Sequence, residues 1–280
     1  MERLKKRPVV CCAVIFMICT AVRVVEYFII RTDETIISEN FIHKVFGILL
    51  LLAVLKGCKW KWSDIGFVRN GMFRRIGAGM LLGSVCFAVA YAVECIVMYV
   101  VNGDVGLEFY ASGFSLTNDM QRQSGIVFIL ICILFNIINV WMEEGVFRGL
   151  FSKILEKMTF VHSTLLIALL FGVWHWAMPL RDYIDGNSAL TNLAVMGLGY
   201  IILAGVMSVK WSLLYKLSGS LWMGLGDHLF NNVIVTNLLH VVSNGEADSM
   251  QIVRIMIGQM VSFVVVGDCY LRRRRVSADI

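Results

Sequence analysis

The chain has 280 residues, of which 58% are hydrophobic and only 16% are charged, and its formal net charge is +5. This balance excludes an ordinary soluble globular protein, because too few charged side chains are present to cover a surface in water. We therefore expect a protein embedded in a lipid bilayer, whose positive charge reflects its orientation there.

Apolar runs long enough to cross a membrane as an α-helix, about 20 residues, recur along the whole chain. We predict eight transmembrane helices, over residues 8–30, 40–56, 77–101, 125–150, 162–179, 190–209, 217–240 and 252–271. The second is the least clearly defined, because Glu39, His43 and Lys44 crowd its start. No internal repeat or Pro/Gly-rich linker divides the chain, so we expect one all-α, polytopic membrane domain over residues 1–280.

The basic residues predict how this bundle is oriented. If both termini are cytoplasmic, the cytoplasmic segments carry nineteen Lys and Arg residues and the opposite segments carry five, which is the bias of the positive-inside rule. The run at 272–275 is typical of a membrane-flanking anchor, and no base-stacking pattern accompanies it. We expect the bilayer as a partner and no nucleic acid. The compact size of the chain favours a bacterial plasma membrane.

Charged residues in the fourth predicted helix indicate where the function lies. Glu143, Glu144 and Arg148 fall near the end of an apolar segment, where each charge costs on the order of 3 kcal/mol. Asn136, Asn139 and Glu143 share one helix face at i, i+3 and i+7, whereas Glu144 and Arg148 lie at i and i+4. We expect Glu144 to pair with Arg148. Glu143 then points into the bundle without a partner, as a carboxyl able to exchange protons.

Polar residues also occur in the fifth and seventh predicted helices. The fifth contains Phe171 and His175, and the seventh contains His228 and Asn232 on one face at i and i+4. Glu143, His175 and His228 each lie roughly 15–20 Å, at 1.5 Å per residue, from a cytoplasmic marker. The three side chains are therefore predicted to share one layer of the membrane. A carboxylate, two imidazoles and an amide in one layer suit a buried hydrolytic site.

These motifs resemble the three signatures of a known family, the CPBP group of intramembrane proteases, also called the Abi family, which includes the type II CAAX prenyl endopeptidases. The signatures are EExxxR, FxxxH and HxxxN/D on successive membrane helices, and here they stand at 143–148, 171–175 and 228–232. The matched region, about 125–240, would be the catalytic core.

The resemblance implies a glutamate-dependent endopeptidase that hydrolyses a peptide bond of a membrane-associated peptide or protein. Glu143 would be the general base that takes a proton from water, with His175 holding or polarising that water. His228 and Asn232 would donate hydrogen bonds to the oxyanion of the tetrahedral intermediate. Four further residues would support the site: Glu144, Arg148, Phe171 and Asn139.

The residues alone leave other possibilities open. Glu143, His175 and His228 also match a His₂Glu set that can hold catalytic zinc, although no HExxH motif is present. The resemblance favours the metal-free mechanism, so zinc is possible and no obligatory cofactor is expected.

Two further alternatives belong to other functional classes. In a non-catalytic immunity or scaffold protein of the same fold, the polar residues would only tie helices together. In a proton-coupled transporter, Glu143, Glu94 and the histidines would relay protons. The complete motifs argue against a scaffold, and the absence of paired, Gly/Pro-interrupted segments argues against a transporter.

Overall fold

The computed structural model describes residues 7–35, 39–112 and 122–278. Its helical segments, in chain order, are α2 (Pro8–Val25), η1 (Glu26–Ile30), η2 (Thr32–Glu34), α3 (Ile42–Cys58), η3 (Trp62–Ile65), α4 (Met72–Asn102), α5 (Ile126–Glu143), η4 (Glu144–Phe151), α6 (Ser152–Ile154), α7 (Phe160–Trp174), α8 (Ala177–Ile184), α9 (Leu190–Ser218), α10 (Trp222–Phe230), η5 (Asn231–Leu238) and α11 (Gln251–Ala278). The prediction of an all-α membrane bundle is confirmed.

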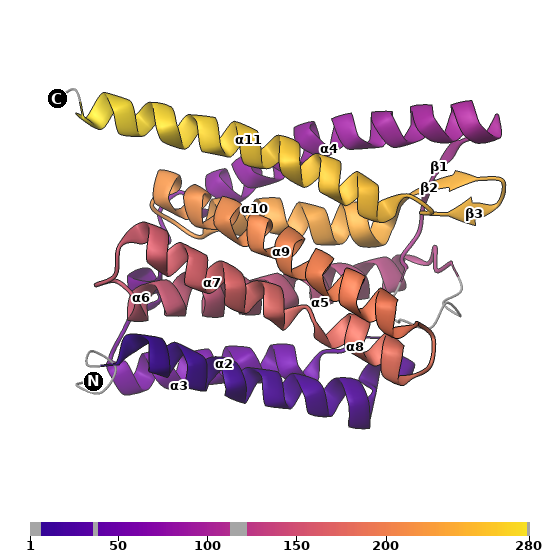
Figure 1. Ribbon diagram of the computed structural model, residues 1–280. Helices are drawn as coiled ribbons and strands as arrows, with labels where there is room; N and C mark the ends of the chain where they lie inside the picture. The colour runs from indigo at the N-terminus through magenta and orange to yellow at the C-terminus, as the bar shows by residue number, and fades with distance from the viewer. Residues whose placement is uncertain (1–6, 36–38, 113–121, 279–280) are drawn as a thin grey trace.

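A helical segment lies at each of the eight predicted positions. Six stretches of helix are long and apolar enough to cross a membrane. The remaining two segments are shorter: α3 has 17 residues, and α10 with 9 residues continues directly into η5 with 8. The start of α2 and the end of α11 lie at the same end of the bundle (Figure 1), as the predicted orientation requires.

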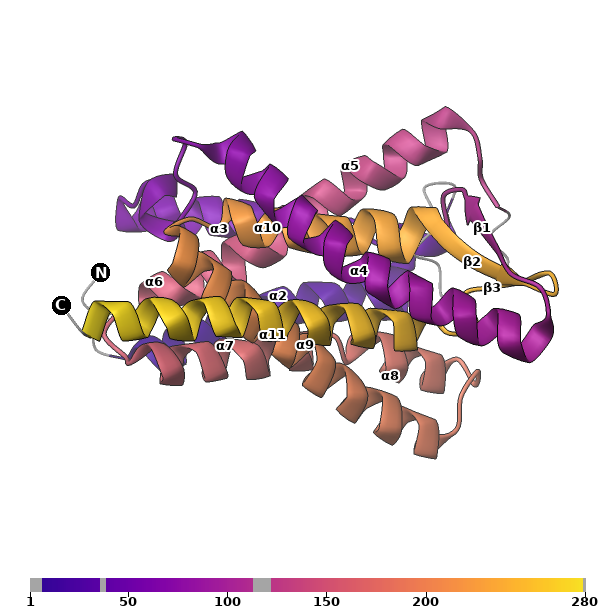
Figure 2. The same ribbon diagram turned by 90° about the horizontal axis from the view of Figure 1, so that it is seen from above.

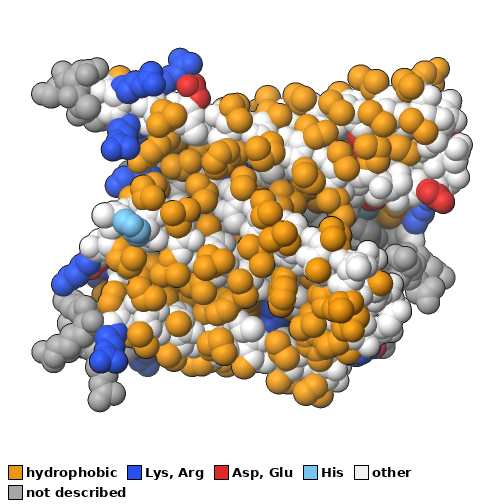
Figure 3. All heavy atoms as spheres, in the orientation of Figure 1, with side chains coloured by type: hydrophobic (Ala, Val, Ile, Leu, Met, Phe, Trp, Pro, Cys, Tyr) orange, Lys and Arg blue, Asp and Glu red, His pale blue; other side chains and the backbone are white. Residues whose placement is uncertain are grey.

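The outer surface matches a membrane environment. Hydrophobic side chains cover the face shown in Figure 3, and its Lys and Arg side chains gather at the end where α2 begins and α11 finishes. Exposed basic residues at this end include Lys59, Arg74 and Arg272. By the positive-inside rule, this is the end that the sequence predicts to be cytoplasmic. Arg3, Lys5 and Lys6, which also entered the predicted bias, lie outside the described residues.

Five basic side chains that were counted in the predicted charge bias lie inside the bundle. They are 0–4% exposed, and each is paired with an acidic side chain. The pairs are Arg148 with Glu144, Lys210 with Asp227, Lys44 with Glu39, Arg181 with Asp33, and Arg254 with Glu94. These five residues therefore do not mark the ends of the bundle, because an ion pair offsets the cost of burying a charge there.

A small antiparallel sheet covers the opposite end of the bundle. Its strands, in the order β1-β2-β3, are β1 (Gly106–Phe109), β2 (Leu239–Ser243) and β3 (Glu246–Ala247). The seventh predicted helix was therefore extended too far, because residues 239 and 240 already belong to β2.

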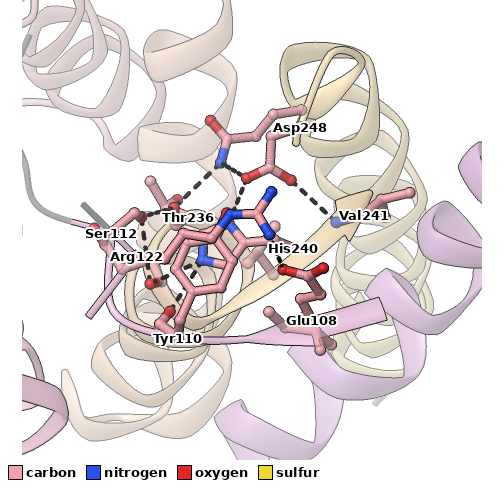
Figure 4. A network of polar contacts seen from close by, with 12 residues as sticks. Glu108, Tyr110, Ser112, Arg122, Thr236, His240, Val241 and Asp248 are labelled. Carbon is pink, nitrogen blue, oxygen red and sulfur yellow. Dashed lines mark hydrogen bonds and ion pairs between the residues drawn. The ribbon is translucent and has the colours of Figure 1, made fainter. Parts of the chain in front are cut away.

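A polar network holds this sheet to the helices (Figure 4). The imidazole of His240 stacks on Tyr110 with ring centroids 3.9 Å apart, and its Nδ1 lies 2.5 Å from Oδ2 of Asp248. Arg254 donates to the other oxygen of Asp248 at 2.8 Å. Burial raises the pKa of Asp248, but the hydrogen bonds with His240 and Arg254 and the charge of Arg254 outweigh burial and lower that pKa below its ordinary value.

Helix α10, which carries His228, lies directly against α4, and Figure 2 shows the two helices crossing. A Cβ atom at Gly79 of α4 would lie 2.0 Å from the carbonyl oxygen of Met223. One at Gly226 of α10 would lie 2.2 Å from the carbonyl oxygen of Ile76. The crossing thus requires glycine on both helices, in the small-residue packing typical of membrane proteins.

Replacement of Gly79 tests this crossing. Gly79→Ala should lower the free energy of unfolding by about 1–3 kcal/mol, because the added methyl group forces the helices apart. Gly77→Ala, two residues earlier on α4 where nothing lies within 4 Å, is the control and should be neutral or slightly stabilising. Thermal unfolding of both purified variants in detergent measures the difference. Equal effects would contradict the close approach of α4 and α10.

Candidate active site

The predicted site residues lie on three helical units that meet inside the bundle. Glu143 is the last residue of α5 and Glu144 the first of η4, His175 directly follows α7, and His228 lies on α10. Asn232 lies one turn beyond His228, in η5. Both η4 and η5 are π-helical, a conformation that is rare and often found at functional sites. Neither π-helix was predicted from the sequence.

Glu144 is the centre of a buried network. Arg148 donates to it twice, from Nε to Oε2 at 3.1 Å and from Nη2 to Oε1 at 2.5 Å, so the predicted i, i+4 pair is present. Oε1 also lies 2.9 Å from Nδ1 of His228. Glu144 and Arg148 are fully buried, and His228 is 3% exposed. Glu144 therefore fixes the rotation of the His228 ring, which turns Nε2 toward Glu143, 3.5 Å from its Oε2.

The face of the His228 ring is fixed by a residue that the sequence analysis missed. Trp211 of α9 stacks on it with ring centroids 3.8 Å apart and an interplanar angle of 16°. The indole Nε1 of Trp211 donates to Oδ2 of Asp227 at 2.8 Å. Asp227 precedes His228 in an apolar helix, and this isolated charge was the signal in the sequence that could have identified the second network.

Glu143 has a partner, contrary to the prediction. The indole Nε1 of Trp174 donates to its Oε1 at 3.0 Å, and both side chains are buried. The guanidinium of Arg23, from α2, lies 4.3 Å from the Trp174 ring and places a positive charge behind the donor. No pattern in the sequence indicates this contact, because Trp174 lies on another helical segment, 31 residues further along the chain. One carboxylate oxygen is thus held, and the other faces His228.

His175 is half-buried and has a defined orientation. Its Nδ1 lies 2.8 Å from the carbonyl oxygen of Phe171, which can only accept, so Nδ1 carries the proton. In the neutral ring, Nε2 is then the acceptor. The Phe171 ring packs edge-on against His175 at 4.7 Å, and the guanidinium of Arg148 lies 4.1 Å from the Phe171 centroid. Phe171 therefore lies beside both the histidine and the buried network.

The two predicted amide residues differ in their contacts. Asn232 is half-buried, and its Oδ1 accepts a hydrogen bond from Nδ2 of Asn231 at 3.0 Å. Its own Nδ2 has no hydrogen bond to any other residue that the structure describes. Asn139 is buried one turn before Glu143, without a side-chain hydrogen bond to another described residue. The structure thus places Asn139 near the site as a packing residue.

Glu143, His175 and His228 are also the side chains that the sequence offers as zinc ligands. Within residues 7–35, 39–112 and 122–278, no three His, Cys, Asp or Glu side chains form a group that could hold a metal ion. Trp174, Phe171 and Glu144 contact Oε1 of Glu143 and the Nδ1 atoms of His175 and His228, so a zinc ion would have to bind Oε2 and the two Nε2 atoms.

Comparison with known families agrees with the motifs. Residues 125–234 match the family model described as Type II CAAX prenyl endopeptidase Rce1-like. No curated protein matches the chain. The matched residues include all three signatures, so the predicted family resemblance is confirmed. Helices α2, α3, α4 and α11 lie outside the match.

Loss of the Glu144 carboxylate should disrupt the buried network. Glu144→Gln should lower the free energy of unfolding by about 3–5 kcal/mol, because it leaves Arg148 charged and buried without a counter-ion. Glu156→Gln removes a carboxylate that is 50% exposed and pairs with Lys153, so it should change stability by less than about 1 kcal/mol. Thermal unfolding in detergent compares the two. A small effect at Glu144 would show that this buried network does not stabilise the fold.

Proposed function

We propose that the protein is an intramembrane endopeptidase in which Glu143 activates a water molecule to hydrolyse a peptide bond of a membrane-associated peptide or protein. The observation that carries this proposal is the meeting of Glu143, His175 and His228 from three helices inside an apolar bundle. The match of residues 125–234 to a prenyl endopeptidase family supports a protease at the family level.

Glu143 is suited to act as the general base. Because Trp174 holds Oε1, the free lone pairs belong to Oε2, and this oxygen takes the proton from water. His175 presents Nε2 as an acceptor, because its Nδ1–H is engaged with the Phe171 carbonyl. The two residues together orient one water molecule, so that its remaining lone pair attacks the scissile carbonyl carbon.

The developing negative charge on the carbonyl oxygen needs donors. With protons on both ring nitrogens, His228 donates through Nδ1 to Glu144 and offers Nε2–H to the oxyanion. Asn232 offers its amide N–H₂ group from the same helix face, one turn further on. In a bundle that excludes water, each preorganised donor contributes several kcal/mol to the transition state.

The substrate must be extended where it is cut, because a helix hides its amide groups from the base. A membrane-bound peptide or the terminal segment of a membrane-attached protein meets this requirement. No metal ion takes part in these steps, and the assay with a zinc chelator, described below, tests for zinc dependence.

The contacts favour catalysis over the two alternatives. A scaffold needs its polar groups paired, yet neither Nε2 of His175 nor Nδ2 of Asn232 bonds to any described residue. A proton relay through Glu94 is disfavoured because Arg254 donates to that carboxylate at 2.7 Å. Glu94 therefore serves as one half of an ion pair between α4 and α11.

Cleavage assays test the proposal. Purified wild-type protein should cleave members of a fluorogenic library of membrane peptides, and Glu143→Gln and His175→Ala should each lower kcat at least 100-fold. Glu156→Gln is the matched carboxylate control. Activity that survives a zinc chelator supports the glutamate mechanism, whereas loss with chelator and recovery with zinc supports a metalloprotease. A wild type that cleaves no peptide contradicts the proposal.

The indole donor to the base gives a second test. Trp174→Phe removes the N–H group and keeps most of the ring, so kcat should fall about 10- to 100-fold with little change in KM, since a hydrogen bond to a charged group contributes about 1.5–3 kcal/mol. Trp222→Phe is the control, because its Nε1 donates to the Val68 carbonyl at 2.9 Å, away from the base. Equal losses in the two variants would argue against a role for Trp174.

A further inference from the structure

The mechanism above does not use the buried ion pair between α9 and α10. Lys210 is fully buried, and its Nζ lies 2.5 Å from Oδ2 of Asp227. The same ammonium donates to Oε1 of Gln259, on α11, at 2.6 Å. A buried pair of this kind is weak evidence for stability alone, because desolvation offsets much of its attraction. Its position beside His228 suggests another use.

A chain of side-chain amides leads from Lys210 to the site. Nε2 of Gln259 donates to Oδ1 of Asn231 at 3.0 Å, and Nδ2 of Asn231 donates to Oδ1 of Asn232 at 3.0 Å. Gln259 is 1% exposed and Asn231 is 5% exposed, so water does not compete for these bonds. The chain joins α9, α11 and η5, and it ends at the amide that the mechanism uses.

Lys210 decides the direction of this chain of hydrogen bonds, that is, which group donates and which accepts at each step. An amide oxygen and nitrogen are nearly alike in shape, but an ammonium group can only donate, so the Gln259 atom that faces it must be the oxygen. The nitrogen of Gln259 then faces Asn231 and requires its oxygen. For the same reason, the nitrogen of Asn231 donates to Asn232, whose oxygen must be the acceptor. Only the N–H₂ group of Asn232 remains free.

We propose that Lys210 and Gln259 are positioning residues that set the direction of the Asn232 amide, so that it presents a donor and not an acceptor to the reacting carbonyl. The inference rests on the proposed function, in which Asn232 binds the oxyanion. A carbonyl oxygen in that place would repel the developing charge. Asp227, the partner of Lys210, also accepts from the Trp211 ring that stacks on His228, so one ion pair supports both oxyanion donors.

The substitution Gln259→Glu reverses donor and acceptor along these hydrogen bonds and hardly changes the shape of the side chain. A carboxylate still accepts from Lys210, but it offers only acceptors to Asn231. Asn231 must then turn its nitrogen toward residue 259 and its oxygen toward Asn232. Asn232 in turn donates to Asn231 and presents its oxygen to the site. We expect kcat to fall at least 100-fold, the effect of losing an oxyanion donor, with KM within about twofold of wild type.

Gln259→Leu separates direction from packing. Leucine breaks the row of hydrogen bonds without reversing it and leaves Lys210 paired with Asp227. The Asn232 amide can then turn either way, so kcat should fall by only about 10-fold. A packing role predicts the opposite order, because leucine loses both hydrogen bonds and glutamate keeps one. Gln251→Leu is the control elsewhere on α11: it removes the hydrogen bonds of Gln251 to the Thr236 carbonyl and to Asp248, outside the amide chain, and should keep kcat near wild type.

The experiment measures kcat, KM and inhibition by a peptide aldehyde, whose hydrate mimics the tetrahedral intermediate, for wild type, Glu143→Gln and the three glutamine variants. Weaker aldehyde inhibition of Gln259→Glu, in step with its kcat, supports the inference. If wild type is active and Glu143→Gln is not, but Gln259→Glu equals wild type or exceeds Gln259→Leu, the inference is overturned and the proposed function stands. Inactive wild type overturns both.

Discussion

A carboxylate buried in a membrane bundle must be neutralised by its neighbours, and at Glu144 these neighbours come from two helices. Arg148 supplies charge from the same helix, and Nδ1 of His228 approaches from α10. The guanidinium also lies 4.8 Å from the Trp211 ring, which in turn stacks on His228. Each contact limits the others, so the imidazole has one position and its Nε2 faces Glu143. The geometry of the site follows from this network.

Similar pairs tie the remaining helices together. Arg254 joins α11 to α4 through Glu94, and Lys210 joins α9 to α10 through Asp227. Lipid is as apolar as the helix surfaces, so burial of apolar area does not by itself hold membrane helices together, and close packing with polar contacts must do so. The paired glycines where α4 meets α10 supply the close packing. The buried charges therefore serve helix association as well as the site.

Three side chains of the candidate site each keep one polar atom free of strong hydrogen bonds. Oε2 of Glu143, Nε2 of His175 and the amide nitrogen of Asn232 are oriented by contacts on their other side and have no strong hydrogen bond with another described residue of the chain. One polar atom fixes the orientation of each side chain, and the other remains available to a substrate. In the proposed mechanism, Trp174 and Gln259 orient these side chains from outside the motifs.

The sequence by itself determined the features that depend on spacing along one helix. Membrane segments follow from runs of apolar residues, and the Glu144–Arg148 pair follows from their i, i+4 spacing, because helix geometry is the same whatever surrounds it. The tertiary structure alone decided the Trp174 partner of Glu143, the Trp211 ring on His228 and the Lys210–Gln259–Asn231 chain. These contacts join residues on different helices, and their formation depends on the rotation and crossing of each helix, which no local pattern specifies.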